Sequence, residues 1–233
     1  MATLLIAGTD TGVGKTLMTT LLAAYWRQYA GGQSLGLMKL LQTGIGDREH
    51  YQALFGDQGH WDLVTPQQWQ TPVAPPIAAL REGQAIALDV VWQKLRELQG
   101  KHPQILVEGL GSLGSPVTEE LTVADLAGLW KLETLLVVPV QLGAMGQAIA
   151  QVALARQCKV KLRGLVLSCH SSESAEKLQD WADPDLLSRF TQLPILGIIP
   201  PLKTEPYPPL EKLAQVASHC DVDALLLDLK ARV

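Results

Sequence analysis

A run of small and polar residues near the start of the chain, AGTDTGVGKT at residues 7–16, contains the residue types that bind phosphate groups. Gly12 and Gly14 allow the backbone to approach a ligand closely. The Lys15 side chain can reach the β- and γ-phosphates of a nucleotide, and the Thr16 hydroxyl can bind Mg²⁺. We therefore interpret this run as a phosphate-binding loop.

The residues on either side of the loop support that interpretation. The apolar run at 4–8 is typical of a buried strand, and residues 15–30 repeat apolar residues at helical spacing. The free N–H groups and the dipole at the start of a helix favour anions. The pattern G-x-x-x-x-G-K-[ST] is matched only from Gly14 onwards, because Thr9 occupies its first position. An ordinary strand-to-helix turn is the alternative.

A metal ion that accompanies a nucleotide needs carboxylate ligands, and the sequence offers two candidates. Glu108 ends the apolar run QILVE, so we expect it at the carboxyl edge of a sheet, where ligands bind. Asp47 in TGIGDREHY is the second candidate, although it could equally cap a helix. Lys39 ends another apolar run and either extends to solvent or stabilises charge during phosphoryl transfer. Thr43 follows in a loop that could face the same cleft.

Short apolar runs alternate with helical patterns along the chain. The runs do not alternate apolar and polar residues, which favours strands buried on both faces. Expected strands lie at 4–8, 35–40, 105–109, 135–140, 163–168 and 195–200, and expected helices at 15–30, 88–99, 122–132 and 144–157. This order predicts an α/β fold of three layers, with a mostly parallel central sheet and helices on both faces, of the P-loop NTPase type. Because no linker is evident, we predict a single domain over 1–233.

Composition limits the classes of function. The chain has 233 residues, 47% of them hydrophobic, and a net charge of −4 with scattered basic residues, so we expect no nucleic-acid partner. No apolar run has the length of a membrane span, and no signal-peptide pattern is present. The three cysteines, Cys158, Cys169 and Cys220, lack metal-ligand spacing. Together these features predict a cytoplasmic location.

The motifs as a set resemble those of the dethiobiotin synthetases, ATP-dependent enzymes of biotin synthesis. The resemblance spans nearly the whole chain, and its most specific part is the phosphate loop with the preceding Thr-Asp-Thr. The matching segments are GTDTGVGKT (8–16), MKLLQTG (38–44), APPIAALREG (74–83), VEGLGSLGSPV (107–117), TVADLA (122–127), VVPVQLGAMGQA (137–148) and LPILGIIP (193–200).

The resemblance implies a reaction. One amino group of 7,8-diaminopelargonic acid (7,8-diaminononanoate) takes up CO₂ to form a carbamate, and ATP phosphorylates the carbamate. The second amine then closes a cyclic urea and releases phosphate. Such chemistry requires positioning and cations around the transferred phosphoryl group, and the expected cofactor is Mg²⁺.

The resemblance also assigns residues. Lys39, Lys15 and Thr11 would act at the reacting phosphoryl and carbamate groups. Thr16, Asp47 and Glu108 would bind Mg²⁺. The nucleotide would contact Gly12, Val13, Gly14, Lys15, Thr16, Ser168, Pro200, Pro201 and Leu202. The diamine substrate would contact Thr43, Gly111, Ser112, Leu113 and Gly114, the last four through backbone N–H groups that bind its carboxylate. A homodimer would complete the site with residues 144–149 of a partner subunit.

Two positions depart from the pattern that the resemblance implies. Ser112 occurs where the family usually has glycine, and Ser168 replaces the Asn that reads adenine. A serine hydroxyl cannot reproduce the donor–acceptor pair of an amide, so base selectivity is expected to be relaxed.

Other functions remain open from the sequence. One is a nucleotide-switch ATPase of the partition type, although Asp10 occupies the position of that group's second lysine. Another is a paralogue with altered nucleotide preference or lost activity. A related amide ligase would need an additional glutaminase region.

Overall fold

The computed structural model describes residues 2–203 and 208–226, and in them seven strands form one sheet with the order β4-β2-β6-β1-β7-β8-β9. Every neighbouring pair in this sheet is parallel. The strands are β1 (Ala2–Gly8), β2 (Leu35–Lys39), β4 (Asp62–Val64), β6 (Gln104–Glu108), β7 (Glu133–Pro139), β8 (Lys161–Ser168) and β9 (Ile195–Ile199). A small parallel pair, β3 (Gln42–Thr43) and β5 (Gln68–Trp69), lies beside it.

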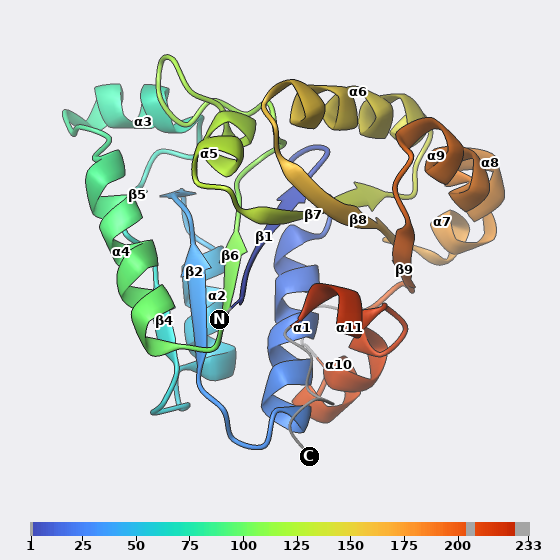
Figure 1. The fold of residues 1–233 in the computed structure, drawn as a ribbon, viewed down its shortest axis with the longest axis horizontal. Helices are drawn as coiled ribbons and strands as arrows, with labels where there is room; N and C mark the ends of the chain where they lie inside the picture. Colours follow the sequence, from blue (N-terminus) through green and yellow to red (C-terminus); the bar gives the residue numbers. More distant parts are fainter. Residues whose placement is uncertain (1, 204–207, 227–233) are drawn as a thin grey trace.

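Helices cover both faces of the sheet, as Figure 1 shows. One face packs against α1 (Lys15–Tyr29), α2 (Asp47–Phe55), α10 (Leu210–Ala217) and α11 (Val222–Leu225). The other packs against α3 (Pro75–Glu82), α4 (Leu88–Lys101), α5 (Val123–Leu129), α6 (Ala144–Gln157), α8 (Leu178–Ala182) and α9 (Pro184–Thr191). The short α7 (Ser172–Glu176) follows β8. The predicted three-layer α/β fold is confirmed.

The central strand β1 shows why an unbroken apolar run indicates a strand that is buried on both faces. Successive side chains of a strand point to opposite faces. Leu4 and Ile6 of β1 therefore join the core beside α1, whereas Leu5 and Ala7 join the core beside α4. Both faces of β1 are buried. A polar side chain at any of these four positions would therefore lose its hydrogen bonds to water without gaining a partner in the protein.

All the expected strands and helices are present with differences at their ends, but the expected elements did not include β3, β4, β5, α2, α3, α10 or α11. The helix at 144–157 has the predicted bounds, and Thr122 caps α5 by accepting from the backbone N–H of Asp125. The charged stretch at 171–189 suggests one solvated helical face, but it contains three short helices, and Pro184 begins the third, α9, directly after Asp183. The three prolines of KTEPYPP predict a loop at 203–209, which lies partly outside the described residues.

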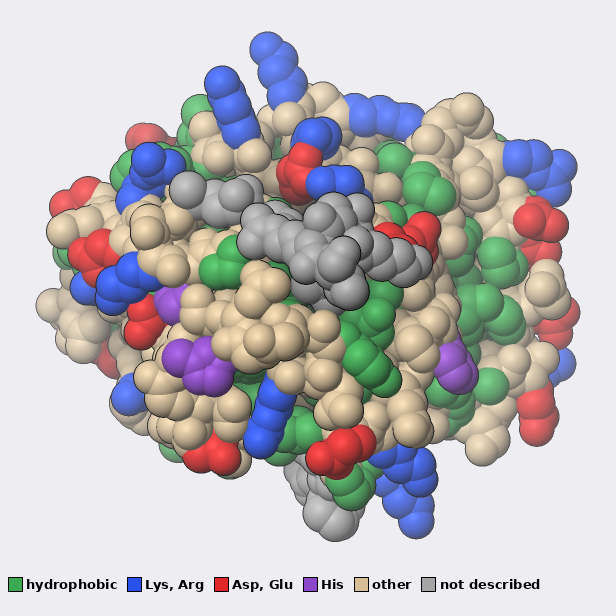
Figure 2. Space-filling model, turned by 60° about the horizontal axis from the view of Figure 1, so that its bottom comes forward, with side chains coloured by type: hydrophobic (Ala, Val, Ile, Leu, Met, Phe, Trp, Pro, Cys, Tyr) green, Lys and Arg blue, Asp and Glu red, His purple; other side chains and the backbone are tan. Residues whose placement is uncertain are grey.

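Charged side chains are mixed on the face drawn in Figure 2. Lys and Arg side chains occur beside Asp and Glu side chains along its rim. None of the described helices is long and apolar enough to cross a membrane.

The parallel strands place their carboxyl ends along one edge of the sheet. The ends of β1, β2 and β6, which are neighbours in the sheet, lie together there.

Candidate active site

The loop between β1 and α1 has a backbone that requires glycine. Gly12 and Gly14 have φ values of +75° and +102°, in the left-handed region that side chains disfavour. A Cβ atom at Gly14 would also lie 2.7 Å from Oγ of Ser168. The loop is thus held against the end of β8, and α1 begins immediately afterwards with Lys15.

Gly14→Ala is expected to destabilise the fold more than the same change at a matched glycine. Gly31 also has positive φ (+59°), but a Cβ there would meet nothing within 4 Å. We expect Gly31→Ala to lower the unfolding free energy by about 1 kcal/mol through backbone strain. Gly14→Ala adds crowding and should lower it by about 3 kcal/mol. Urea unfolding measures both values, and equal values would contradict the close approach to Ser168.

Lys15 is buried and bonded to backbone oxygens. Its Nζ donates to the carbonyl oxygens of Asp10 at 2.8 Å and Gly111 at 2.7 Å. Burial, together with the charge of Lys39, lowers the pKa of Lys15 from 10.5 to about 8. The ammonium therefore bridges the phosphate-binding loop and the loop after β6, and an anion there would help to keep it charged.

Lys39 and Glu108 are register partners at the ends of neighbouring strands. Nζ of Lys39 lies 3.0 Å from Oε1 of Glu108, 2.5 Å from Oδ2 of Asp47 and 3.0 Å from the carbonyl oxygen of Gly109. Burial opposes the charge of this lysine, but Glu108 and Asp47 outweigh it and raise its pKa. Lys39 therefore does not extend to solvent.

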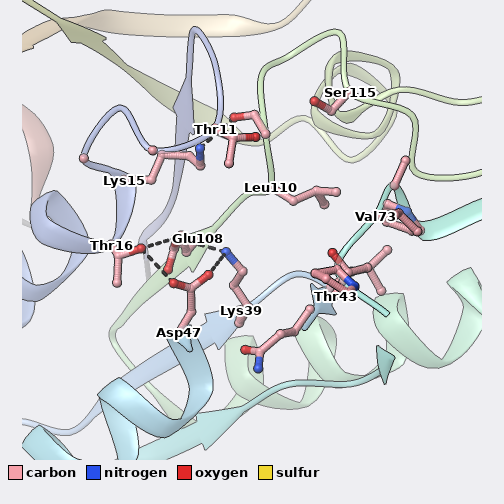
Figure 3. Close-up of a pocket in the computed structure, with 18 of the residues that line it drawn as sticks. Thr11, Lys15, Thr16, Lys39, Thr43, Asp47, Val73, Glu108, Leu110 and Ser115 are labelled. Atoms are coloured by element: carbon pink, nitrogen blue, oxygen red, sulfur yellow. Dashed lines mark hydrogen bonds and ion pairs between the residues drawn. The ribbon is translucent and has the colours of Figure 1, made fainter. Parts of the chain in front are cut away.

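The Thr16 hydroxyl joins the same cluster, as Figure 3 shows. Its Oγ1 lies 2.9 Å from Oδ1 of Asp47 and 2.9 Å from Oε1 of Glu108. Two carboxylates and one hydroxyl thus converge, and Lys39 balances only one of the two negative charges. Hard oxygen donors with a net negative charge suit Mg²⁺, which commonly uses one or two carboxylates and fills its other positions with phosphate and water. The three residues predicted to bind the metal fit such an ion.

Helix α2, which supplies part of this cluster, begins where the sequence offered Asp47 as a possible helix cap. Asp47 is its first residue rather than its cap; the cap is Gly46, whose N–H donates to Oε2 of Glu49 at 2.9 Å. One turn later, the Tyr51 hydroxyl donates to Oε2 of Glu108. Burial and the neighbouring Glu108 raise the pKa of Tyr51 well above its usual value, so the phenol stays protonated.

A cavity of about 670 Å³ opens beside these groups. Sequence analysis had singled out ten of its lining residues: Thr11, Gly12, Gly14, Lys15, Thr16, Lys39, Thr43, Asp47, Glu108 and Gly111. The wall opposite the phosphate loop comes from residues 72–75, and Leu110, Ser115, Pro116 and His170 complete the rim. Residues from distant parts of the sequence therefore meet in one cleft.

Three of the residues predicted to contact the substrate lie outside the cavity lining. Ser112, Leu113 and Gly114 do not line it, and the N–H groups of Ser112 and Gly114 already donate to the side chains of Ser115 and Gln151. Their role in binding a carboxylate stays a prediction that requires these bonds to change.

Ser168 is fully buried at the end of β8. Its Oγ has no hydrogen-bond partner in the described part of the chain and lies under Gly14. Pro200, Pro201 and Leu202 directly follow β9, the strand that pairs with β8. They are half-buried and do not line the main cavity. The nucleotide roles of these four residues stay predictions.

Several lining residues carried no recognisable signal in the sequence. Val73 is one of them, and it forms the far wall because the chain returns there between β5 and α3. Ala74 and Pro75 beside it belong to the matching segment at 74–83, but no role was predicted for them. Tyr51 could have been found, because it lies four residues after Asp47 and such pairs share a helix face.

Known proteins with similar sequences show the family of this chain. The ATP-dependent dethiobiotin synthetase BioD of Synechocystis sp. is 61% identical over 223 residues, covering 96% of this chain and 94% of the relative. The chain belongs to the dethiobiotin synthetase family. The enzyme of the same name from Gloeothece citriformis is 54% identical, covering 97% of this chain and 99% of the relative. The resemblance predicted from the motifs is therefore confirmed.

Wider comparisons place dethiobiotin synthetases among P-loop proteins. A family model described as an AAA domain matches residues 2–205. The MinC:MinD cell division complex of Aquifex aeolicus aligns with a TM-score of 0.56 at 15% identity, over 97% of this chain and 94% of that one. A ParA family ATPase from Chlorobium tepidum aligns with a TM-score of 0.54 at 12% identity, over 95% and 91% of the two chains. At these identities only the fold is shared, which confirms the predicted fold type.

Proposed function

We propose that this chain uses ATP to convert 7,8-diaminopelargonic acid and CO₂ to dethiobiotin, ADP and phosphate, a cyclo-ligase step of biotin synthesis. The single observation that carries the proposal is the 61% identity to a relative of that name over nearly both full lengths. The site supports it, because Lys15, Lys39, Thr16, Asp47 and Glu108 converge on one cavity.

The proposed chemistry has three steps. One amine of the substrate attacks CO₂ and loses a proton, which gives a carbamate. A carbamate oxygen attacks the γ-phosphorus of ATP, the bond from that phosphorus to the bridging oxygen breaks, and ADP leaves. The second amine attacks the carbonyl carbon of the mixed anhydride, and the carbon–oxygen bond to phosphate breaks. The amine transfers its proton to a phosphate oxygen, and the cyclic urea forms. Positioning of these groups supplies much of the acceleration.

The chain's own residues stabilise negative charge in this scheme. The loop at 12–16 provides N–H groups at the start of α1, and Lys15 provides a cation at the phosphates. Lys39 provides a second cation toward the carbamate and the transferred phosphoryl group. Both ammonium groups now contact protein oxygens, so substrate oxygens would replace those of Gly111 and Glu108 as partners.

Thr16, Asp47 and Glu108 would hold Mg²⁺. The ion supplies charge neutralisation at the phosphate oxygens. The residues keep it in place by pairing two carboxylates with a hydroxyl that is fixed on the first turn of α1.

A homodimer belongs to the same proposal. Leu142, beside the start of α6, is 82% exposed although it is apolar, and Gly143, Gly146 and Gln147 next to it are also exposed. A partner subunit that covers this segment would bury that leucine and bring residues 144–149 toward a substrate site.

Nucleotide affinity is expected to fall as pH rises above the pKa of Lys15, which is about 8. The phosphates favour the charged ammonium, and the unliganded protein loses this proton above that pH. Binding must then take up a proton, so affinity should drop roughly tenfold between about pH 7.5 and about pH 9.5. Titration with a fluorescent ATP analogue measures the effect. The arginine of Lys15→Arg stays charged in this range, so the nucleotide affinity of that variant should not change with pH. An equally steep fall in its affinity would assign the titration to another group.

The test of the reaction is an assay with the purified protein, 7,8-diaminopelargonic acid, bicarbonate and Mg²⁺, with ATP, CTP and GTP in parallel. We expect phosphate release that depends on the diamine, and dethiobiotin identified by mass spectrometry. Similar rates with all three nucleotides would support relaxed base selectivity at Ser168. Strong preference for ATP would mean that other groups read the base. Absence of product from folded, nucleotide-binding protein would refute the proposal and favour a switch ATPase or a paralogue without this activity.

A further inference from the structure

Tyr51 is a buried phenol in direct contact with the metal-site carboxylate Glu108. The two side chains are 2% and 1% exposed, and the phenol hydroxyl donates to Oε2 of the carboxylate. Tyr51 does not line the main cavity, so it cannot touch substrate directly. Its hydroxyl therefore acts on the site only through Glu108.

The two oxygens of Glu108 have different partners. Oε1 lies 2.9 Å from the Thr16 hydroxyl and 3.0 Å from Nζ of Lys39, whereas Oε2 accepts from Tyr51. A carboxylate held at one oxygen cannot rotate freely about its terminal bond. The phenol thus fixes which oxygen of Glu108 faces Thr16 and Asp47.

Helix α2 carries both Tyr51, which contacts Glu108, and the second carboxylate of the site, Asp47. Asp47 and Tyr51 are four residues apart, so both project from one face of the helix. His50, between them, lies with its Nε2 2.9 Å from Oγ1 of Thr20 on α1. The helix that presents one metal ligand therefore also orients the other, and it docks on the helix that carries Thr16.

We propose that Tyr51 is a positioning residue that holds Glu108 with Oε1 presented to the divalent cation. The inference rests on the proposed role of Thr16, Asp47 and Glu108 as metal ligands. Groups that hydrogen-bond to a metal ligand fix its orientation, and their loss typically weakens metal binding about 10- to 100-fold. A purely structural tyrosine would change stability without this effect.

The test compares Mn²⁺ binding to the wild-type protein and to Tyr51→Phe. Electron paramagnetic resonance with a non-hydrolysable ATP analogue gives the dissociation constant. We expect an increase of about 10-fold or more, a matching increase in the Mg²⁺ concentration for half-maximal rate, and a kcat at saturating Mg²⁺ close to that of the wild type. Tyr29→Phe is the matched control, because it removes the same atom from a side chain that is 50% exposed.

A double-mutant cycle with Glu108→Gln decides whether Tyr51 acts through Glu108. If it does, Tyr51→Phe has no further effect on Mn²⁺ affinity once Glu108 is changed. Unchanged Mn²⁺ affinity in folded Tyr51→Phe, or an equal loss in both backgrounds, would overturn the inference. Because the variant keeps the aromatic ring, circular dichroism should confirm that it folds. A wild-type protein that makes no dethiobiotin would instead count against the proposed function.

Discussion

Lys39→Met is expected to lower kcat about a thousandfold, because the variant loses a buried cation next to the transferred phosphoryl group. Lys39 is only 5% exposed, and no other lysine or arginine lines the described cavity except Lys15. Water cannot easily replace the missing charge in so buried a position. Nucleotide affinity should change less than kcat, since the phosphate loop and Lys15 remain.

The stability of Lys39→Met should also depend on Mg²⁺ more strongly than that of the wild type. Without Lys39, Asp47 and Glu108 share the Thr16 hydroxyl with no counter-ion between them. Unpaired buried charge is destabilising; with Asp47 partly exposed we expect a loss of about 2–3 kcal/mol. Mg²⁺ can take the place of the ammonium and should raise the melting temperature of the variant more than that of the wild type.

Steady-state rates and thermal unfolding with and without Mg²⁺ measure both effects. Lys94→Met is the control, because that lysine is 44% exposed and pairs with Glu97 on the same helix. A Lys39→Met enzyme with a rate within tenfold of the wild type would show that this lysine does not stabilise the reaction.

Glu108→Gln is expected to raise the Mg²⁺ requirement by a factor of about 100 or more. The cluster of Lys39, Asp47 and Glu108 carries a net charge of −1, and the amide makes it neutral. An amide oxygen is also a weaker ligand for a hard cation than a carboxylate. Lys39 keeps its contact with Asp47 at 2.5 Å, so the fold should tolerate the change better than the loss of Lys39.

Rates measured across a wide range of Mg²⁺ concentrations test this expectation. Glu133→Gln makes the same substitution at the start of β7, at the opposite edge of the sheet, and should leave the Mg²⁺ requirement unaltered. A wild-type Mg²⁺ profile in Glu108→Gln would remove Glu108 from the metal site.

The sequence predicted the parts of the fold that are governed by local pattern. The strand that ends at Glu108 and the helix at 144–157 could be identified because apolar runs and helical spacing are properties of adjacent residues. The short helix α2 was indicated only by the possible cap at Asp47, since it has nine residues and buries only Tyr51 and Phe55. Its stability comes from packing against α1 and β4 rather than from its own sequence.

The candidate site likewise contains residues that the local pattern predicted and contacts that it could not predict. Lys15, Lys39 and Glu108 were found because each follows or ends a buried run, and parallel strands bring such ends to one edge. The partners that now occupy Lys15 and Lys39 could not be predicted, because they depend on which strands are neighbours. The burial of Ser168 beneath Gly14 is likewise a contact between the end of β8 and a loop that lies far from it in the sequence.

The central position of β1 has a consequence for how the protein is made. Ala2 pairs with Gln104 and Leu4 pairs with Glu133, so β1 waits for partner strands that leave the ribosome much later than it does. Long-range parallel pairing of this kind is slow, and the early segment stays exposed in the meantime. The phosphate-binding loop can therefore become rigid only after β7 is in place, and a nucleotide can stabilise only chains that have reached that stage.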